Sequence, residues 1–232
     1  MKKRIIADIR LFKTDSMEDG DTFTTSFGDK TLNAIIQRVV MKLRENEFSL
    51  GEFDHLYINF TTCDVAGNMS LSDEVDRYNP WYRYCHIHVE KEQYRKLSSG
   101  EAADEVIHWI STVLVTYFAT EDFGKARIRS CIHEAIEQGE KMLMKFREKV
   151  SAKRKAVVYL RYLDTCRFYP LLRVYDTEEN LLFEKDLPET LTLDYLGEIH
   201  ISAKKVTVKP RKNAFTAQLE PLIFEYGNEM VL

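Results

Sequence analysis

The chain has 232 residues, of which 44% are hydrophobic and 30% are charged, a composition typical of a folded globular protein and not of a disordered one. No segment reaches the roughly 18 consecutive apolar residues of a membrane-spanning helix, and Asp8 and Arg10 interrupt the apolar residues that follow the basic start. We therefore expect neither a membrane partner nor export. The four cysteines are widely spaced without a C-x-x-C pair, which favours reduced thiols and a cytoplasmic location.

Charge is distributed unevenly along the chain. Residues 1–140 carry 24 acidic against 17 basic side chains, a net charge of −7, whereas residues 141–232 carry 13 against 16, a net charge of +3. A nucleic-acid-binding protein usually has one strongly basic patch, and the candidates here are residues 141–155 and 204–212. Because lysines recur every four residues in the first of these stretches, as on any solvated helix face, we do not favour nucleic acid as a partner.

The first part of the chain predicts a β-α-β unit. Residues 4–13 predict a buried strand, residues 14–28 a polar, acid-rich loop, and residues 53–62 a strand whose apolar and polar side chains alternate. Between the strands we expect a helix that is capped by Asp29 or Thr31. Its apolar stripe consists of Leu32, Ile35, Ile36, Val39, Val40 and Leu43.

A long loop and a further strand come next. Residues 64–80 are rich in turn-forming residues and predict an exposed loop. Residues 81–89 predict a strand, and residues 90–97 a short helix. Alternation along the strand sends side chains to opposite faces. We expect Trp81, Cys85, Ile87 and Val89 toward the core, and Tyr82, Tyr84, His86 and His88 on the other face.

Residues 98–150 predict two long amphipathic helices in tandem. A capping box of Ser98 and Glu101 predicts the start of the first helix, and residues 118–122 interrupt the apolar stripe between the two. Gly139 is the one weak interior position of the second helix, which we expect to continue to Val150. The stripes consist of Val106, Ile107, Ile110, Val113, Leu114 and Tyr117, then Ile128, Cys131, Ile132, Ala135, Ile136, Met142, Leu143, Phe146 and Val150.

From residue 151 onward apolar residues recur with period two, which predicts strands in an antiparallel β meander. The fold class is therefore α+β. Residues 1–150 form an N-terminal β-α-β-β unit with two long central helices, and residues 151–232 a β-rich region. Whether this region is a separate domain stays open, with residues 151–155 as the candidate boundary. The predicted strands are residues 156–163, 167–176, 181–184, 191–195, 198–208 and 214–226.

Two histidines are the candidate metal ligands. His86 and His88 lie two apart in a predicted strand, so both imidazoles point to one side and can share a cation. A third ligand is missing, and His55 joins them only if the two strands are neighbours. Exposed histidines among tyrosines explain the pattern without a metal, so we expect no metal and no cofactor. The sequence contains no G-x-G-x-x-G, P-loop or G-x-S-x-G motif that would signal phosphate binding or nucleophilic catalysis.

An acidic loop that leads into an aromatic strand is the candidate partner-binding surface. Tyrosine, tryptophan and arginine contribute much of the binding energy in protein interfaces, and acidic residues steer and orient a partner. The alternative is a tyrosine-rich sheet face that the protein's own helices cover. The candidate contact residues are Asp73, Glu74, Asp76, Tyr82, Arg83 and Tyr84.

Three stretches in the first 150 residues carry a resemblance to a known group of proteins. They are residues 4–10 (RIIADIR), residues 53–60 (FDHLYINF) and residues 80–84 (PWYRY). As a set, in an α+β chain, they resemble the immunity proteins that accompany bacterial polymorphic toxins. The resemblance implies a cytosolic binding protein that neutralises a cognate toxin by occluding its active site or an adjacent surface.

Two other hypotheses stay open. One is an enzyme of unknown substrate that uses His86 and His88 as metal ligands, or His55 as a base. The other is a structural partner in a larger assembly. Catalysis would need a concave site at which an acid, a base and a positioning group converge.

Overall fold

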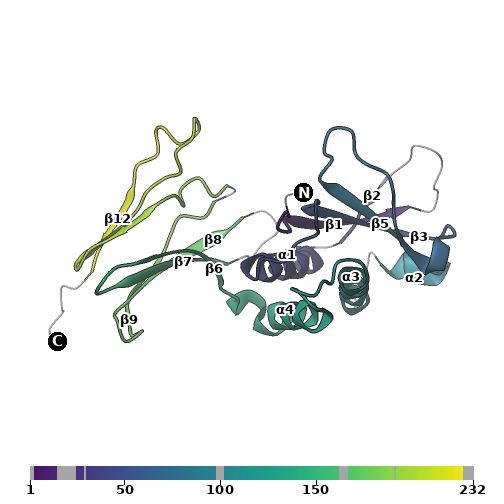
Figure 1. Cartoon of the computed structure of the whole chain (residues 1–232), viewed down its shortest axis with the longest axis horizontal. Helices are drawn as coiled ribbons and strands as arrows, with labels where there is room; N and C mark the ends of the chain where they lie inside the picture. Colours follow the sequence, from purple (N-terminus) through teal and green to yellow (C-terminus); the bar gives the residue numbers. More distant parts are fainter. Residues whose placement is uncertain are drawn as a thin grey trace. The chain divides into compact units, whose positions relative to one another are not determined.

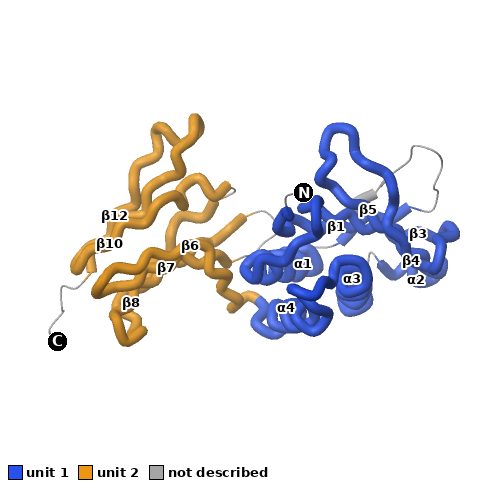
Figure 2. The backbone as a smooth tube through the Cα atoms, viewed as in Figure 1, with its two compact units in different colours: residues 1–139 blue, residues 140–232 orange. Residues whose placement is uncertain are grey.

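The computed structural model describes residues 3–14, 25–28, 30–97, 102–161, 167–190 and 192–226. The chain divides into two compact units, Met1–Gly139 and Glu140–Leu232 (Figure 2). The division falls ahead of the candidate boundary at residues 151–155. Helices and three sheets are present in the described ranges, and the predicted α+β class is confirmed.

The first unit contains a five-stranded sheet in the order β2-β1-β3-β5-β4 (Figure 1). Its central strands β1 (Asp8–Thr14), β3 (His55–Thr61) and β5 (Tyr82–His88) are parallel to one another. The edge strands β2 (Thr25–Ser26) and β4 (Met69–Leu71) pair antiparallel with β1 and β5. Strand β1, helix α1 (Lys30–Glu45) and strand β3 form the predicted β-α-β unit.

Helices α1 and α3 (Ala103–Tyr117) lie on one face of this sheet, and α4 (Lys125–Gln138) packs against these two helices on their side away from the sheet (Figure 1). Two short helices complete the unit, η1 (Ala66–Asn68) and α2 (Lys91–Lys96), which begins at a capping box of Glu90 and Gln93. None of the helices in the described ranges combines the length and apolar character that crossing a membrane requires. The core between sheet and helices includes Ile9, Leu11, Ile36, Val39, Leu43, Leu56, Ile58, Phe60, Cys85, Ile87, Ile110, Leu114, Ile128 and Ile132.

The prediction of a second helix that continues to Val150 is wrong. Helix α4 ends at Gln138 because Gly139 adopts φ 51° and ψ −132°, a conformation that residues with a Cβ atom rarely adopt. A short 3-10 helix, η3 (Gly139–Lys141), follows, and Met144 and Phe146 then belong to strand β6 (Met144–Val150). Ile136, which we expect on the buried stripe, is 47% exposed. The predicted helix start at residues 98–101 lies outside the described residues.

The second unit contains two antiparallel sheets. The larger is the predicted meander, made of β6, β7 (Lys155–Arg161), β8 (Tyr169–Tyr175) and β9 (Leu181–Asp186) in sequence order. The smaller is made of β10 (Ile199–Ile201), β11 (Lys205–Val208) and β12 (Leu222–Glu225). The core of the second unit includes Ala156, Val158, Leu160, Leu172, Val174, Leu196, Ile199, Val206 and Val208.

Turns shorten the predicted strands of the second unit. The predicted strand 198–208 is a hairpin of β10 and β11, closed where the backbone amide of Ser202 donates to the carbonyl of Lys205 at 2.8 Å. The predicted strand 214–226 keeps only β12, because residues 213–216 form a turn in which Asn213 accepts from the amide of Phe215 at 2.8 Å. Residues 192–195 form bends and turns instead of the predicted strand 191–195, and Leu191 lies outside the described residues.

Candidate functional site

Polar and aromatic side chains occupy the face of the first sheet that points away from α1, α3 and α4. The register of the parallel strands sets them in rows, because residues paired across a sheet point to the same face. His55, Tyr57, Tyr82 and Tyr84 form what we call the aromatic face. The rows across β1, β3 and β5 are Asp8, His55 and Tyr82; Arg10, Tyr57 and Tyr84; and Phe12, Asn59 and His86.

The rings of the aromatic face contact one another. The ring centroid of Tyr82 lies 4.8 Å from that of His55 and 4.8 Å from that of Tyr57. The rings of Tyr57 and Tyr84 lie 5.5 Å apart in an edge-on arrangement. These distances fall in the range of favourable aromatic pairs. Tyr57 and Tyr84 are buried, whereas His55 and Tyr82 stay half-buried, so the cluster is a fixed platform that is partly open to solvent.

Ion pairs border the aromatic face. Arg10 donates to Asp8 at 2.7 Å, and its guanidinium lies 5.6 Å from the ring centroid of Tyr57. Asp54 accepts two hydrogen bonds, from Nδ1 of His55 at 2.6 Å and from Arg4 at 2.7 Å. The hydrogen-bonded ion pairs, and the contact of the Arg10 guanidinium with the Tyr57 ring, hold these charged groups beside the aromatic rings.

Tyr84 connects the aromatic face to the loop before β5. Its hydroxyl donates to Oδ2 of Asp76 at 3.2 Å. Burial, together with the charge of Asp76, raises the pKa of Tyr84 to about 12. Burial and the hydroxyl contact with Tyr82 also raise the pKa of Tyr57. The raised pKa values keep both hydroxyls protonated, and able to donate hydrogen bonds, further into the alkaline range than in an ordinary tyrosine.

Residues 72–81, between β4 and β5, form an ordered loop that rises from the sheet on the side away from the helices (Figure 1). Oδ1 of Asp76 accepts from the backbone amides of Tyr78 and Asn79 at 2.8 and 2.7 Å. The Ser72 hydroxyl accepts from the amide of Glu74 at 3.1 Å. Such side-chain turns fix a loop without neighbouring strands. Hydrogen bonding to the two amides lowers the pKa of Asp76.

The structure brings some of the predicted contact residues together and separates others. Asp73 and Glu74 are exposed on the 72–81 loop, and Tyr82 lies at the open part of the aromatic face. Asp76 and Tyr84 instead bond to each other. Arg83 points to the other face of β5, with its guanidinium 5.1 Å from the ring centroid of Phe53.

Trp81, which we expect in the core, is half-buried. Its ring lies 5.2 Å from the guanidinium of Arg4 and 6.2 Å from the ring of Tyr82. It precedes β5, so strand alternation does not fix its direction. The other expected core residues of this strand region, Cys85, Ile87 and Val89, are buried as predicted.

Sequence reasoning missed two residues of this surface, Val75 and Tyr78. The side chain of Tyr78 is 80% exposed and that of Val75 is 58% exposed. Large apolar side chains at ordered loop tips are common anchors in interfaces. The sequence does contain a signal for this exposure. Asp76, Asn79 and Pro80 predict a turn, and residues within an exposed turn, such as Tyr78, project into solvent.

The candidate metal ligands make separate contacts. Asn59 donates to Nδ1 of His86 at 3.3 Å, and Nδ1 of His88 donates to the carbonyl of Cys63 at 2.8 Å. Strands β3 and β5 are neighbours, but the register pairs His55 with Tyr82, at the opposite end of β5 from His88. Burial lowers the pKa of His86, which favours its neutral form. No group of three or more potential metal ligands occurs among the described residues.

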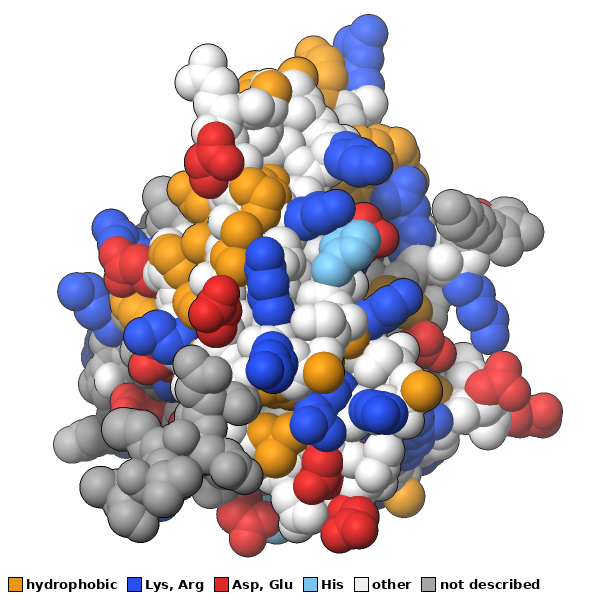
Figure 3. All heavy atoms as spheres, turned by 90° about the vertical axis from the view of Figure 1, so that its left-hand side faces the viewer, with side chains coloured by type: hydrophobic (Ala, Val, Ile, Leu, Met, Phe, Trp, Pro, Cys, Tyr) orange, Lys and Arg blue, Asp and Glu red, His pale blue; other side chains and the backbone are white. Residues whose placement is uncertain are grey.

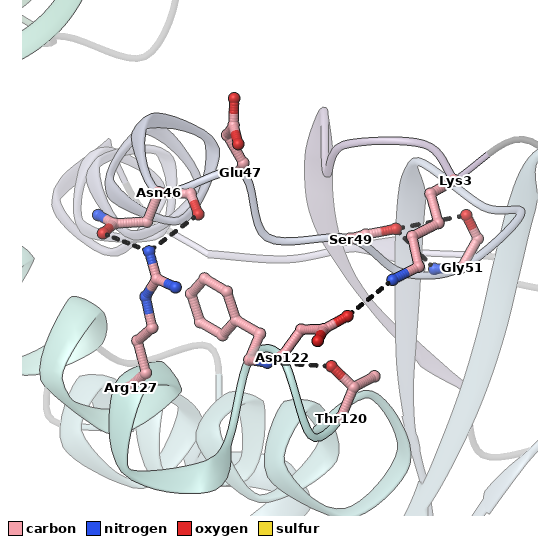
Figure 4. Close-up of a pocket in the computed structure, with 9 residues that line it drawn as sticks. Lys3, Asn46, Glu47, Ser49, Gly51, Thr120, Asp122 and Arg127 are labelled. Atoms are coloured by element: carbon pink, nitrogen blue, oxygen red, sulfur yellow. Dashed lines mark hydrogen bonds and ion pairs between the residues drawn. The ribbon is translucent and has the colours of Figure 1, made fainter.

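A pocket of about 230 Å³ lies elsewhere in the first unit (Figure 4). Its lining residues come from the N-terminal segment, the turn after α1, and the connection between α3 and α4 with the start of α4. Lys3 pairs with Asp122 at 3.3 Å, while Arg127 donates to Asn46 at 3.4 Å and lies 4.4 Å from the ring centroid of Phe123. Because the lining side chains bond to one another across the pocket, we interpret it as a structural junction.

The chain matches no protein-family model, no curated protein and no solved structure. What it binds is therefore inferred from its own residues.

Proposed function

We propose that the first unit binds a partner protein through the 72–81 loop and the adjoining aromatic face. We further propose that the chain is an immunity protein that neutralises a bacterial toxin by this contact. The observation that carries the proposal is the ordered loop on which Tyr78 is 80% exposed and which also carries two exposed carboxylates, Asp73 and Glu74. The resemblance to immunity proteins adds the nature of the partner.

The order of the loop favours binding. A flexible loop loses conformational entropy when a partner fixes it, and this loss weakens the complex. Asp76 already fixes the backbone of Tyr78 and Asn79, and Tyr84 fixes Asp76 to the sheet. The exposed side chains therefore lie on a loop that is already ordered. Less of the binding free energy is then lost to ordering the loop when a partner binds.

The exposed carboxylates and the aromatic rings have different roles in this proposal. Asp73 and Glu74 steer a basic partner surface toward the loop, an effect that mainly changes the association rate and weakens as salt increases. Tyr78 and Tyr82 fill apolar contacts in the complex, an effect that mainly changes the dissociation rate. A basic surface around a toxin's active site is the complementary partner.

Binding kinetics against the product of the gene directly upstream test the proposal. The double variant Asp73→Ser, Glu74→Ser should associate more slowly and with a weaker salt dependence. Tyr78→Ala and Tyr82→Ala should each speed dissociation, with a loss of about 2 kcal/mol of binding free energy at a hot spot. The matched control is Glu137→Ser, Glu140→Ser, which removes two exposed charges from another surface. Equal rates for all these variants and the wild type would place the interface elsewhere.

Histidine-based catalysis is a second candidate function, favoured by one contact. The carboxylate of Asp54 holds Nδ1 of His55 at 2.6 Å, which orients the ring and leaves Nε2 for accepting a proton. Hydrolysis of p-nitrophenyl acetate checks this candidate. A catalytic His55 predicts that His55→Gln loses the activity while His133→Gln, on the exposed face of α4, keeps it. Identical rates for both variants would argue against this reaction.

A further inference from the structure

The second unit contains a basic pocket of about 410 Å³. One wall comes from β6, and the other from the segments on either side of β10 and β11. Four cationic side chains and one carboxylate line it. The lining residues are Arg147, Gly197, Glu198, Lys209, Pro210, Arg211 and Lys212.

The fold combines two basic stretches that are separate in the sequence. Arg147 belongs to the stretch 141–155, and Lys209, Arg211 and Lys212 belong to the stretch 204–212. The helical lysine spacing that argued against a nucleic-acid partner does not apply to the first stretch, because residues 144–150 form strand β6. Figure 3 shows a face on which many Lys and Arg side chains gather near the middle, with Asp and Glu side chains between them and along the edge.

Gly197 makes possible the close approach of the two segments that form the second wall. Its amide donates to the carbonyl of Lys209 at 2.8 Å, and the amide of Lys209 donates to the backbone carbonyl of Glu198 at 2.8 Å. A Cβ atom at Gly197 would collide with the backbone carbonyls of Lys209 and Pro210. The segment that carries Lys209, Arg211 and Lys212 is therefore held at a fixed position by backbone hydrogen bonds.

The pocket has an excess of positive charge. Its one carboxylate, Glu198, lies 3.1 Å from Nε2 of His200, and this contact, followed by the charges of Lys209 and Lys212, lowers the Glu198 pKa. The guanidinium groups of Arg147 and Arg211 both lie 5.8 Å from the ring centroid of Phe146, so the two cations flank one ring. Guanidinium groups match the geometry of phosphate oxygens.

An exposed aromatic residue follows the cationic segment in the chain. Phe215, three residues after Lys212, is 89% exposed. Asn213 holds its backbone, accepting from the Phe215 amide at 2.8 Å and donating to Asp194 at 3.1 Å. The loop between β11 and β12 (yellow in Figure 1) thus carries an exposed phenyl ring on an ordered turn that directly follows the cationic segment in the chain. Proteins that bind single strands combine these two features, a basic groove and aromatic platforms for bases.

We propose that the basic pocket binds the phosphate backbone of a single-stranded nucleic acid, with Phe215 as a platform on which a base stacks. The site lies in the second unit and does not depend on the proposed protein-binding surface of the first. Phosphates contact Arg147, Arg211 and Lys212, and Lys209 adds charge from the pocket wall. Backbone contacts of this kind carry little sequence preference.

The test is fluorescence anisotropy of the full chain with a labelled oligothymidylate of about 12 nucleotides. The variant Arg211→Ser, Lys212→Ser should lower affinity about tenfold, and the slope of log affinity against log salt should fall by about 1.4, or 0.7 for each lost phosphate contact. The matched control Lys204→Ser, Lys205→Ser removes two exposed charges from the β10–β11 hairpin, one in the turn and one at the start of β11. Its affinity should stay within about twofold of the wild type.

A second variant separates nucleic acid from other polyanions. Phe215→Ala should weaken oligothymidylate binding about fivefold or more, because it removes base stacking, and should leave heparin binding unchanged. No binding of the oligonucleotide by the wild type at low salt would overturn the proposal. Equal binding of polyglutamate at the same salt, or unchanged oligonucleotide affinity in Phe215→Ala, would also overturn it and would indicate an acidic protein or a plain polyanion.

Discussion

At the scale of single residues, Asp76 organises the proposed binding surface. Its two carboxylate oxygens have separate tasks, since one accepts from the loop amides and the other from the hydroxyl of Tyr84. From the sequence, Asp76 is predicted to contact a partner, because an aspartate on a loop can steer a partner by its charge. The structure shows that the carboxylate of Asp76 bonds within the protein, whereas that of Asp73 is exposed.

The Tyr84 pKa gives a pH prediction. Its value of about 12, against 10.0 normally, means that folding favours the neutral hydroxyl. This contribution to the free energy of unfolding is fully present below pH 10 and is lost as the pH rises from 10 toward 12. Denaturant unfolding at several alkaline pH values should show a steeper loss of stability for the wild type than for Tyr84→Phe, which has no ionisable hydroxyl.

Asp76→Asn is the companion variant. It removes the charge that, after burial, contributes most to the raised Tyr84 pKa, so ultraviolet titration should find this tyrosine ionising at lower pH than in the wild type. Tyr84→Phe identifies the Tyr84 transition by its loss, and an unchanged Tyr84 transition in Asp76→Asn would contradict the Tyr84–Asp76 contact.

At the scale of secondary structure elements, substitutions in helix α4 test which of its faces is buried. Ile132 is 5% exposed, whereas Ile136, one turn later, is 47% exposed. A carboxylate buried at position 132 costs several kcal/mol, a large part of a total stability of ~5–15 kcal/mol. Ile132→Asp should abolish soluble expression and Ile136→Asp should preserve it. Soluble, folded protein from both variants would show that this stripe is not part of the core.

Gly197 gives a second prediction at this scale. Gly197→Ala would force the segment 209–212 away from its neighbour and should lower the free energy of unfolding by about 1–3 kcal/mol. Gly124→Ala, at the start of α4, meets only ordinary contacts and should cost less than about 1 kcal/mol. Urea unfolding measures both. Equal stability of the two variants would mean that the close approach at Gly197 is not required.

The helix stripes could be predicted from the sequence where many residues repeat one period. Buried positions of α3 such as Ile110 and Leu114 are those that the 3.6-residue period selects. The error at β6 arose because Met142, Leu143 and Phe146 fit both a helical stripe and a strand, and one glycine decides between them. The strands after residue 190 were predicted too long, because local turns, not hydrophobic periodicity, set the ends of β10, β11 and β12.

At the scale of the whole molecule, the division between Gly139 and Glu140 gives a prediction about fragments. Strand β6 pairs with β7 along its length, so a fragment of residues 140–232 keeps the whole meander, whereas residues 151–232 lose an edge strand and uncover β7. We expect the first fragment to be monomeric and folded by circular dichroism and gel filtration, and the second to aggregate. The reverse result would move the boundary to residue 151.

The candidate sites depend on contacts between segments that are distant in sequence. The parallel pairing of β3 with β5 joins His55 to Tyr82, and the pocket of the second unit joins Arg147 to Arg211. Sequence patterns set which face a residue takes within one strand, but not which strands are neighbours. The acidic loop and aromatic strand could thus be predicted, whereas the basic pocket could not.

Hydrogen exchange of the chain alone and in complex with the product of the upstream gene tests the proposed binding surface most directly. Protection should increase in peptides that cover residues 72–81, which contain Val75 and Tyr78, and should stay unchanged in peptides from α4. Increased protection in other parts of the chain, with residues 72–81 exchanging as they do in the free protein, would contradict the proposed surface.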